Sequence, residues 1–200
     1  MLLQESQAVQ RTLILPVYVD DLLPIGDKIL CDDFEKWIPK YFNVAITCDV
    51  SLFLGIRVIR DRTAIPPFFS IDQEVYACKI ITRSGINLNK QPTTPLPVQE
   101  KLTKSDGMMD RETTKIYQTA IGSLMYLMLR TRPDLTYSVG KLSRFSSNPL
   151  DEHVDAVIRV LQYVYMTSDL CQKYSQQNRE NSLNPYGFTD SDWAADVSDS

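Results

Sequence analysis

Two adjacent carboxylates, Asp20 and Asp21, lie between two apolar runs in the segment TLILPVYVDDLLPI, residues 12–25. Burying two neighbouring negative charges is costly unless a cation neutralises them. A divalent ion such as Mg²⁺ does so, and an acidic pair that helps to hold two such ions can support in-line phosphoryl transfer. Asp is also a common turn residue, so the dipeptide alone leaves a solvated Asp-Asp turn as the alternative.

The elements around this pair indicate how it is positioned. Residues 12–25 predict a β-hairpin, because β-branched and aromatic residues favour strands and Asp tolerates a tight turn. Pro16 and Pro24 each remove a backbone donor and therefore belong at an edge or a bulge. A helix follows, capped by Asp32 or Asp33. Its apolar face comprises Phe34, Trp37, Ile38, Tyr41 and Phe42.

A second mixed region is predicted over residues 51–85. Its elements are a strand Ser51–Ile59, a turn Arg60–Pro67, a strand Phe68–Ile71 and a helix Gln73–Arg83 stopped by Gly85. The proline- and threonine-containing segment 87–110 has little periodicity, which is typical of an irregular linker. We expect a subdomain boundary there.

Three amphipathic helices are predicted beyond the linker, and together they would form a small bundle. They span Ile116–Leu129, Pro133–Ser146 and Pro149–Met166. Thr131 to Asp134 resembles a capping box at the start of the second helix, and Asn148 is the expected cap of the third. His153 is expected to cap or to pack rather than to act as a base.

The composition excludes collagen-like, mucin-like and fully disordered proteins. Hydrophobic residues make up 44% and charged residues 23% of 200 residues, which is a globular composition, and the net charge of −4 provides no global field for nucleic acid. Any such binding must be local. Four widely spaced cysteines with one histidine support neither zinc nor a disulfide framework and fit a reducing compartment. No apolar run approaches the length of a membrane span, so we expect an intracellular protein without a membrane partner.

The segment ILPVYVDDLLPIGD resembles the Tyr-x-Asp-Asp hairpin of reverse transcriptases, and the chain as a whole resembles the copia-type long-terminal-repeat retrotransposon polyprotein. Further motifs follow in the family's order. Residues 51–56 resemble the primer-grip segment, residues 70–76 the S-x-x-Q-x-x-Y stretch and residues 94–96 the T-P-L linker. Residues 117–127 and 131–134 match the G-S-L-M-Y-L and T-R-P-D signatures, and residues 189–194 resemble the start of ribonuclease H.

The resemblance implies roles at the matching positions. Asp20 and Asp21 would be catalytic palm carboxylates that hold Mg²⁺ or Mn²⁺, with Asp20 the direct ligand, and Asp190 would be the first metal ligand of ribonuclease H. Tyr18 and Val19 would lie under the primer terminus and template. Leu54 and Gly55 would belong to the primer grip, where glycine admits a phosphate backbone; a β-bulge is the alternative for Gly55 alone.

The predicted bundle would be the thumb or connection that packs against the emerging duplex. Its expected phosphate contacts are Arg130, Arg132, Lys141, Arg144 and Arg159. A solvated charged face is the alternative for any one of them. Trp193 is expected in a core rather than stacked on a base.

The expected fold is α+β: a partial palm of hairpin plus helix, a helical thumb or connection, and the first strand of a ribonuclease H-like domain. The expected divisions are 1–60 (palm and primer grip), 61–110 (hairpin, helix and linker), 111–175 (thumb or connection) and 176–200 (start of ribonuclease H). The implied partners are an RNA/DNA primer-template, a dNTP in the full-length enzyme and the remainder of the polyprotein, in the cytoplasm within a virus-like particle or in the nucleus.

Two functional readings remain open. The first is a segment of an RNA-directed DNA polymerase that is inactive alone, because nothing in residues 1–11 resembles the family's other palm carboxylate in its K-x-D-V segment. The second is a decayed or domesticated, non-enzymatic fragment that binds nucleic acid or a protein partner. A nuclease built on Asp190 and Asp192 would need more carboxylates than this segment supplies.

Overall fold

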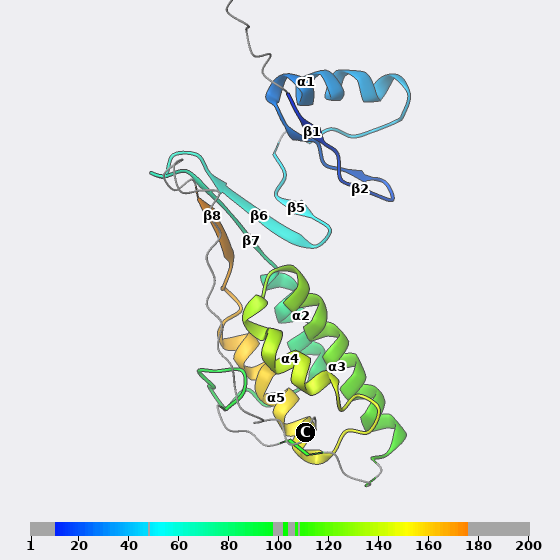
Figure 1. Ribbon diagram of the computed structural model, residues 1–200, viewed down its shortest axis with the longest axis vertical. Coiled ribbons are helices and arrows are strands. Elements are labelled where there is room, and N and C mark those ends of the chain that lie inside the picture. Colours follow the sequence, from blue (N-terminus) through cyan, green and yellow to red (C-terminus); the bar gives the residue numbers. More distant parts are fainter. Residues whose placement is uncertain (1–10, 48, 98–101, 104–106, 108, 176–200) are drawn as a thin grey trace, which may run out of the picture. The chain divides into compact units, whose positions relative to one another are not determined.

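The computed structural model describes residues 11–47, 49–97, 102–103, 107 and 109–175 (Figure 1). The chain forms two compact units that divide after Phe53. Each unit mixes helix with strand, as expected. No helix in the described part of the chain is long and apolar enough to cross a bilayer.

The first unit begins with the predicted hairpin. Its short strands are β1 (Leu13–Ile14), β2 (Val17–Tyr18), β3 (Asp21–Leu22) and β4 (Ile25–Gly26). β1 pairs with β4 and β2 with β3, both antiparallel and in one continuous register. Pro16 and Pro24 lie between the two ladders, where the Leu23 amide donates to the Pro16 carbonyl at 3.1 Å. The prolines therefore interrupt the hairpin without breaking its register.

The first helix, α1 (Lys28–Trp37), starts earlier than the sequence pattern predicts. Asp27 is the cap, and its carboxylate accepts a hydrogen bond from the Ile29 amide at 3.0 Å. The predicted cap at Asp32 or Asp33 is therefore wrong, because a suitable cap already follows β4. α1 continues into a short 3₁₀ turn, η1 (Ile38–Lys40).

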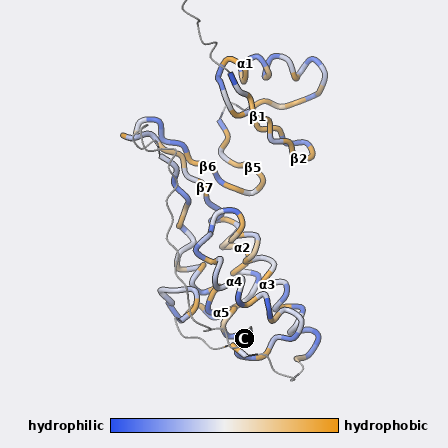
Figure 2. Tube along the Cα trace, viewed as in Figure 1, coloured by the Kyte–Doolittle hydropathy of each residue, from blue (hydrophilic) through white to orange (hydrophobic). Residues whose placement is uncertain are grey.

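The first unit buries little of its apolar surface. Among its described residues Ile38 alone is buried, and Tyr41 and Phe42 of the predicted apolar face are 66% and 60% exposed. Hydrophobic residues also recur along the β1–β4 hairpin (Figure 2). A hairpin and one helix with so small a core gain little stability from burial.

The second unit contains an antiparallel sheet that includes β6 (Ile56–Asp61), β7 (Phe68–Asp72) and β8 (Gln172–Ser175). The predicted single strand 51–59 is instead interrupted: β5 (Leu52–Phe53) ends the first unit, and a turn at Leu54–Gly55 leads into β6. β8 was not predicted, because its sequence QKYS carries no clear alternation. It returns the chain to β7 after the last helix.

An ion-pair network fixes the start of the helical part to the sheet. Asp72, at the end of β7, is 2% exposed, and both of its oxygens lie 3.0 Å from Nε of Arg57 in β6. The same guanidinium donates to Glu74 at 2.6 Å. Hydrogen bonding to Asp72 raises the pKa of Arg57 against the lowering effect of desolvation. The Arg57 charge therefore compensates the buried Asp72 where the next helix begins.

Four α-helices pack together beside this sheet (Figure 1). They are α2 (Glu74–Ser84), α3 (Arg111–Arg130), α4 (Thr136–Ser143), which the 3₁₀ turn η2 (Pro133–Leu135) precedes, and α5 (Asp151–Met166). α5 and the η2–α4 segment match the predicted helices to within three residues at each end, whereas α3 begins five residues earlier than predicted, because Asp110 caps it. Gly85 ends α2 with a φ of 60°. α2 belongs to the same bundle, so the bundle has one more helix than predicted.

The expected boundary within 87–110 is not where the chain divides. Leu96 and Leu102 are 7% and 8% exposed and belong to the same hydrophobic core as Ala77 of α2 and Leu124 of α3. Apolar residues of this segment fill gaps between the helices, although its described residues form neither helix nor strand. For the described residues the composition therefore predicted the irregular conformation but not the place in the fold.

The predicted capping and packing role of His153 is confirmed. It is fully buried, its ring stacks on Phe145 at 3.9 Å, and its Nδ1 accepts a hydrogen bond from the Leu150 amide at 2.8 Å. Leu150 is the residue at the N-cap of α5, so the expected cap at Asn148 is wrong. The Asn148 side chain instead donates to the Gly107 carbonyl.

Candidate functional site

The acidic pair lies at the tip of the hairpin. Val19 and Asp20 form the two-residue turn between Tyr18 and Asp21, which pair across β2 and β3. Val19 has a φ of 53° and is 87% exposed. A positive φ at the first turn position alone is the pattern of a type II′ turn, where glycine is normally found. A β-branched residue in this conformation is strained, and such strain is concentrated at functional sites.

The donor chemistry of this tip suits a hard divalent cation. Asp20 and Asp21 offer carboxylate oxygens, which are the ligands that Mg²⁺ and Mn²⁺ prefer. Within the described residues, however, no cluster of three or more His, Cys, Asp or Glu side chains could hold a metal ion. The hairpin therefore fits as part of a metal site and requires further ligands. Asp190 lies outside the described residues.

The Leu54–Gly55 turn forms the second candidate feature. Leu54 and Gly55 have φ values of 51° and 75°, and two successive positive values are typical of a type I′ turn. A Cβ added at Gly55 would lie 3.5 Å from the Tyr126 hydroxyl, an ordinary contact. Backbone conformation rather than crowding therefore requires glycine here, and the turn takes the place of the bulge considered from sequence.

Tyr126 of α3, for which the sequence predicted no role, holds this turn. Its hydroxyl donates to the Leu54 carbonyl at 3.0 Å, and its ring meets Tyr76 edge-on at 4.9 Å. The guanidinium of Arg130, one helical turn later, lies 5.9 Å from the same ring. The i, i+4 spacing of tyrosine and arginine was the signal that could have identified this cluster.

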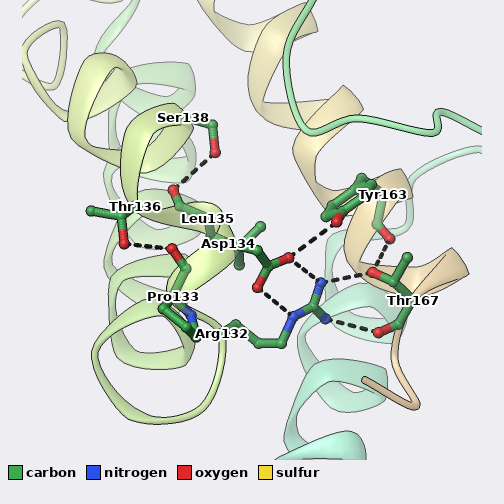
Figure 3. A network of polar contacts seen from close by, with 8 residues as sticks. All are labelled: Arg132, Pro133, Asp134, Leu135, Thr136, Ser138, Tyr163 and Thr167. Atoms are coloured by element: carbon green, nitrogen blue, oxygen red, sulfur yellow. Dashed lines mark hydrogen bonds and ion pairs between the residues drawn. The ribbon is translucent and has the colours of Figure 1, made fainter. Parts of the chain in front are cut away.

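Arg132 does not fit its predicted phosphate-binding role. Its side chain is 4% exposed and pairs with Asp134 through two hydrogen bonds of 3.0 and 2.9 Å. It also donates to the carbonyl and hydroxyl of Thr167, and Tyr163 donates to the same carboxylate (Figure 3). Burial alone would raise the pKa of Asp134, but the Arg132 hydrogen bonds and charge lower it overall. Arg132 joins η2 to the end of α5 and has no exposed face for a phosphate.

The other predicted cations do not form one cluster. Lys141 and Arg144 lie near the end of α4, where Leu142 and Ser146 accept hydrogen bonds from Tyr117 and Gln118 of α3. Arg130 ends α3, about 18 Å farther along that helix at 1.5 Å per residue. Arg159 donates to Thr94 and so holds the linker. Arg130 on one side and Lys141 with Arg144 on the other remain as two separate basic positions.

Comparison with known proteins shows the family to which this chain belongs. It is 34% identical over 92% of its length to a retrovirus-related Pol polyprotein from transposon RE2 of Arabidopsis thaliana. It is also 34% identical to the Pol polyprotein from transposon TNT 1-94 of Nicotiana tabacum, again over 92% of the chain. The chain belongs to the copia-type retrotransposon Pol polyproteins. No family model and no solved structure matches it.

The chain matches a small part of the length of these Pol polyproteins. It spans 12% of the RE2 polyprotein and 14% of the TNT 1-94 polyprotein. It also matches the uncharacterized mitochondrial protein AtMg00810 of Arabidopsis thaliana at 32% identity, over 90% of this chain and 71% of that protein. The same segment thus occurs both within long polyproteins and as most of a short protein.

Proposed function

We propose that this copia-type segment supplies the Tyr-x-Asp-Asp hairpin and the primer-grip turn of a reverse transcriptase, an RNA-directed DNA polymerase. The observation that carries the proposal is the hairpin tip, where Val19 adopts a φ of 53° directly before Asp20. Strain of this kind costs about 1–3 kcal/mol and is retained where function requires the geometry. A turn that served only to connect two strands would favour glycine at position 19.

Within this proposal Asp20 and Asp21 hold Mg²⁺, with the remaining carboxylates coming from elsewhere in the polyprotein. The bound ions would stabilise the charge that develops as a primer oxygen attacks a dNTP. Tyr18 and Val19 lie at the exposed tip beside the primer and template. The bundle α2–α5 serves as the thumb or connection, and residues 189–194 begin a ribonuclease H-like domain.

The Leu54–Gly55 turn would contact the primer backbone. Its link to Tyr126 fixes the turn to α3, so that the turn and the thumb would move as one body against the primer-template. Arg130, Lys141 and Arg144 would contact backbone phosphates at two separate positions, which suits the regular backbone of a duplex. Arg132 is omitted because it is buried.

The second candidate function is nucleic-acid binding without polymerisation. It is favoured by the coverage of AtMg00810, in which this segment is most of the protein, and by the lack of a third metal-binding side chain beside the acidic pair within the described residues. The 200 residues alone are then expected to bind a primer-template hybrid and not to extend it.

Primer extension by the longer polyprotein that contains this segment tests the proposal. Asp20→Asn should abolish extension with Mg²⁺, because it removes a metal ligand while the shape of the side chain is retained. Asp33→Asn, an exposed position on α1, is the matched control and should leave extension unchanged. Undiminished extension by Asp20→Asn would refute the assignment of this hairpin to the polymerase site.

A further inference from the structure

A row of three side chains crosses the sheet of the second unit. Arg60 of β6 pairs with Phe69 of β7, and Phe69 pairs with Tyr174 of β8. Directly paired residues lie on the same face of a sheet, so the three side chains form a line across one face. None of them has a role in the proposed function. The row lies at the opposite end of β6 from the Leu54–Gly55 turn.

The aromatic members of this row are stacked and exposed. The Phe69 and Tyr174 rings lie 4.7 Å apart at an interplanar angle of 12°, and they are 41% and 45% exposed. They line an open depression of about 410 Å³, whose charged lining residues are Arg60, Arg62 and Asp61. The Tyr174 hydroxyl donates to Gln172 at 2.6 Å, which holds the ring in place. The surface is therefore a preformed aromatic platform rather than a loose side chain.

The charged residues at this end of the sheet differ between the two faces of the sheet. Alternation along β6 and β8 places the side chains of Asp61 and Lys173 on the face opposite Arg60 and Tyr174. Asp61, the last residue of β6, nevertheless borders the depression. One Asp61 oxygen accepts hydrogen bonds from Thr63 and Ala64. The charged member of the row is therefore Arg60, and two arginines against one carboxylate border the depression in a chain whose net charge is −4.

We propose that the row Arg60–Phe69–Tyr174 binds single-stranded nucleic acid. An unpaired base stacks on the aromatic platform, and the Arg60 guanidinium contacts the adjoining phosphate. Aromatic rings with neighbouring cations are the shared chemistry of single-strand binding, which accepts every base because each has a π face. A paired base has no free face to offer, so the site selects unpaired nucleotides. The inference goes beyond the polymerase role and would hold in either candidate function.

Binding of a fluorescein-labelled oligo(dT) to the full 200-residue chain, followed by anisotropy at several salt concentrations, tests the proposal. Tyr174→Leu keeps an apolar strand residue but removes the π face, and should weaken binding about tenfold. Tyr165→Leu, a tyrosine of α5 that is 44% exposed, is the matched control and should bind as the wild type does. A 2-aminopurine base in the oligonucleotide should be quenched by the wild type and not by Tyr174→Leu.

Arg60→Gln should reduce the slope of log K against log salt by about 0.7, as expected for one lost phosphate contact on a single strand. Arg83→Gln, at the exposed end of α2, is its control. Equal oligonucleotide affinity of Tyr174→Leu and the wild type would overturn the proposal, as would a folded wild type that does not bind at low salt. Self-association that Tyr174→Leu abolishes, without oligonucleotide binding, would overturn it in favour of a second copy as the occupant.

Discussion

The Tyr126 hydroxyl donates a hydrogen bond to the Leu54 carbonyl at 3.0 Å, across 72 residues of chain. Leu54 is the first of the two central residues of a turn, and both central residues, Leu54 and Gly55, have a positive φ. A leucine in this conformation needs an external restraint, because only glycine adopts it without strain. The bond to α3 provides that restraint, and it makes the geometry of the turn depend on the helical bundle.

Tyr126→Phe tests this dependence. The substitution removes one partly buried hydrogen bond and keeps the ring against Tyr76, so it should lower the free energy of unfolding by about 1 kcal/mol. Amide hydrogen exchange in the peptide covering residues 52–58 should accelerate selectively. Tyr137→Phe, whose ring is 70% exposed, is the control and should leave exchange in this peptide unchanged. An unaltered rate in Tyr126→Phe would show that the turn is held by other contacts.

Arg132→Gln should destabilise the bundle strongly. The substitution removes a buried charge that makes two hydrogen bonds to Asp134 and two to Thr167. Breaking such a pair costs about 3 kcal/mol or more, because it leaves the partner carboxylate without compensation. Thermal unfolding followed by circular dichroism measures the loss. Arg130→Gln, at an exposed position two residues earlier, should stay within about 0.5 kcal/mol of the wild type. Similar melting temperatures for both variants would contradict the structural role.

The free energy of unfolding should fall as the pH decreases below 6.5. Burial lowers the pKa of His153 below its ordinary value of 6.5, although the charge of Glu152 acts in the opposite direction. The unfolded chain therefore binds the proton first, so stability is fully present above pH 6.5 and is lost as the pH falls toward the lowered pKa. Protonation of Nδ1 would also place a hydrogen against the Leu150 amide.

Urea unfolding between pH 7.5 and 5.5 measures this dependence. His153 is the single histidine of the chain, so His153→Gln should flatten the profile while its amide oxygen can still accept from Leu150. A profile that stays as steep in this variant would assign the effect to other groups.

Leu161→Asp should cost several kcal/mol, because Leu161 is 3% exposed in the core and the new carboxylate would have no partner there. The exposed position 173 serves for comparison. Lys173 lies 3.7 Å from the Phe68 ring centroid, so Lys173→Ala should lower stability by about 0.5–1 kcal/mol. Chemical denaturation of the three proteins gives the ranking. Equal stability of Leu161→Asp and the wild type would show that the α5 face is misassigned.

The elements that local chemistry specifies could be predicted from sequence. Strand-forming runs around Asp20 predicted the hairpin, and helical periodicity with Gly85 as a stop predicted the ends of α2 to within a residue. Elements that depend on partners distant in the sequence could not be predicted in this way. β8 forms because β7 offers it an edge, and Leu102 is buried because four helices leave a gap for it. Neither partner is visible within the local sequence.

In the candidate site, too, the features that depend on local sequence could be predicted, and those that depend on the folded backbone or on distant residues could not. The residue types Asp20 and Asp21 indicated metal chemistry, and the strained φ of Val19 was invisible until the backbone was known. Arg132 matched a family signature, but its burial depends on Thr167, which lies 35 residues later. A charged residue in a motif thus predicts a position of importance without showing whether it serves the fold or a ligand.

The pairing of β7 with β8 has a consequence for biosynthesis. Ile71 lies opposite Gln172, so all four helices of the bundle are inserted between two neighbouring strands of one sheet. On the ribosome, β7 is complete about 100 residues before its neighbour has been made. Helices α2, α3 and α4 are synthesised within that interval and have mainly local and helix–helix contacts to form, whereas α5 ends at Met166, shortly before β8 begins, and the sheet must wait. A chain that ends after Thr167 but before Gln172 would therefore contain all four helices and leave one edge of β7 unpaired, a species suited to aggregation or to pairing with another copy.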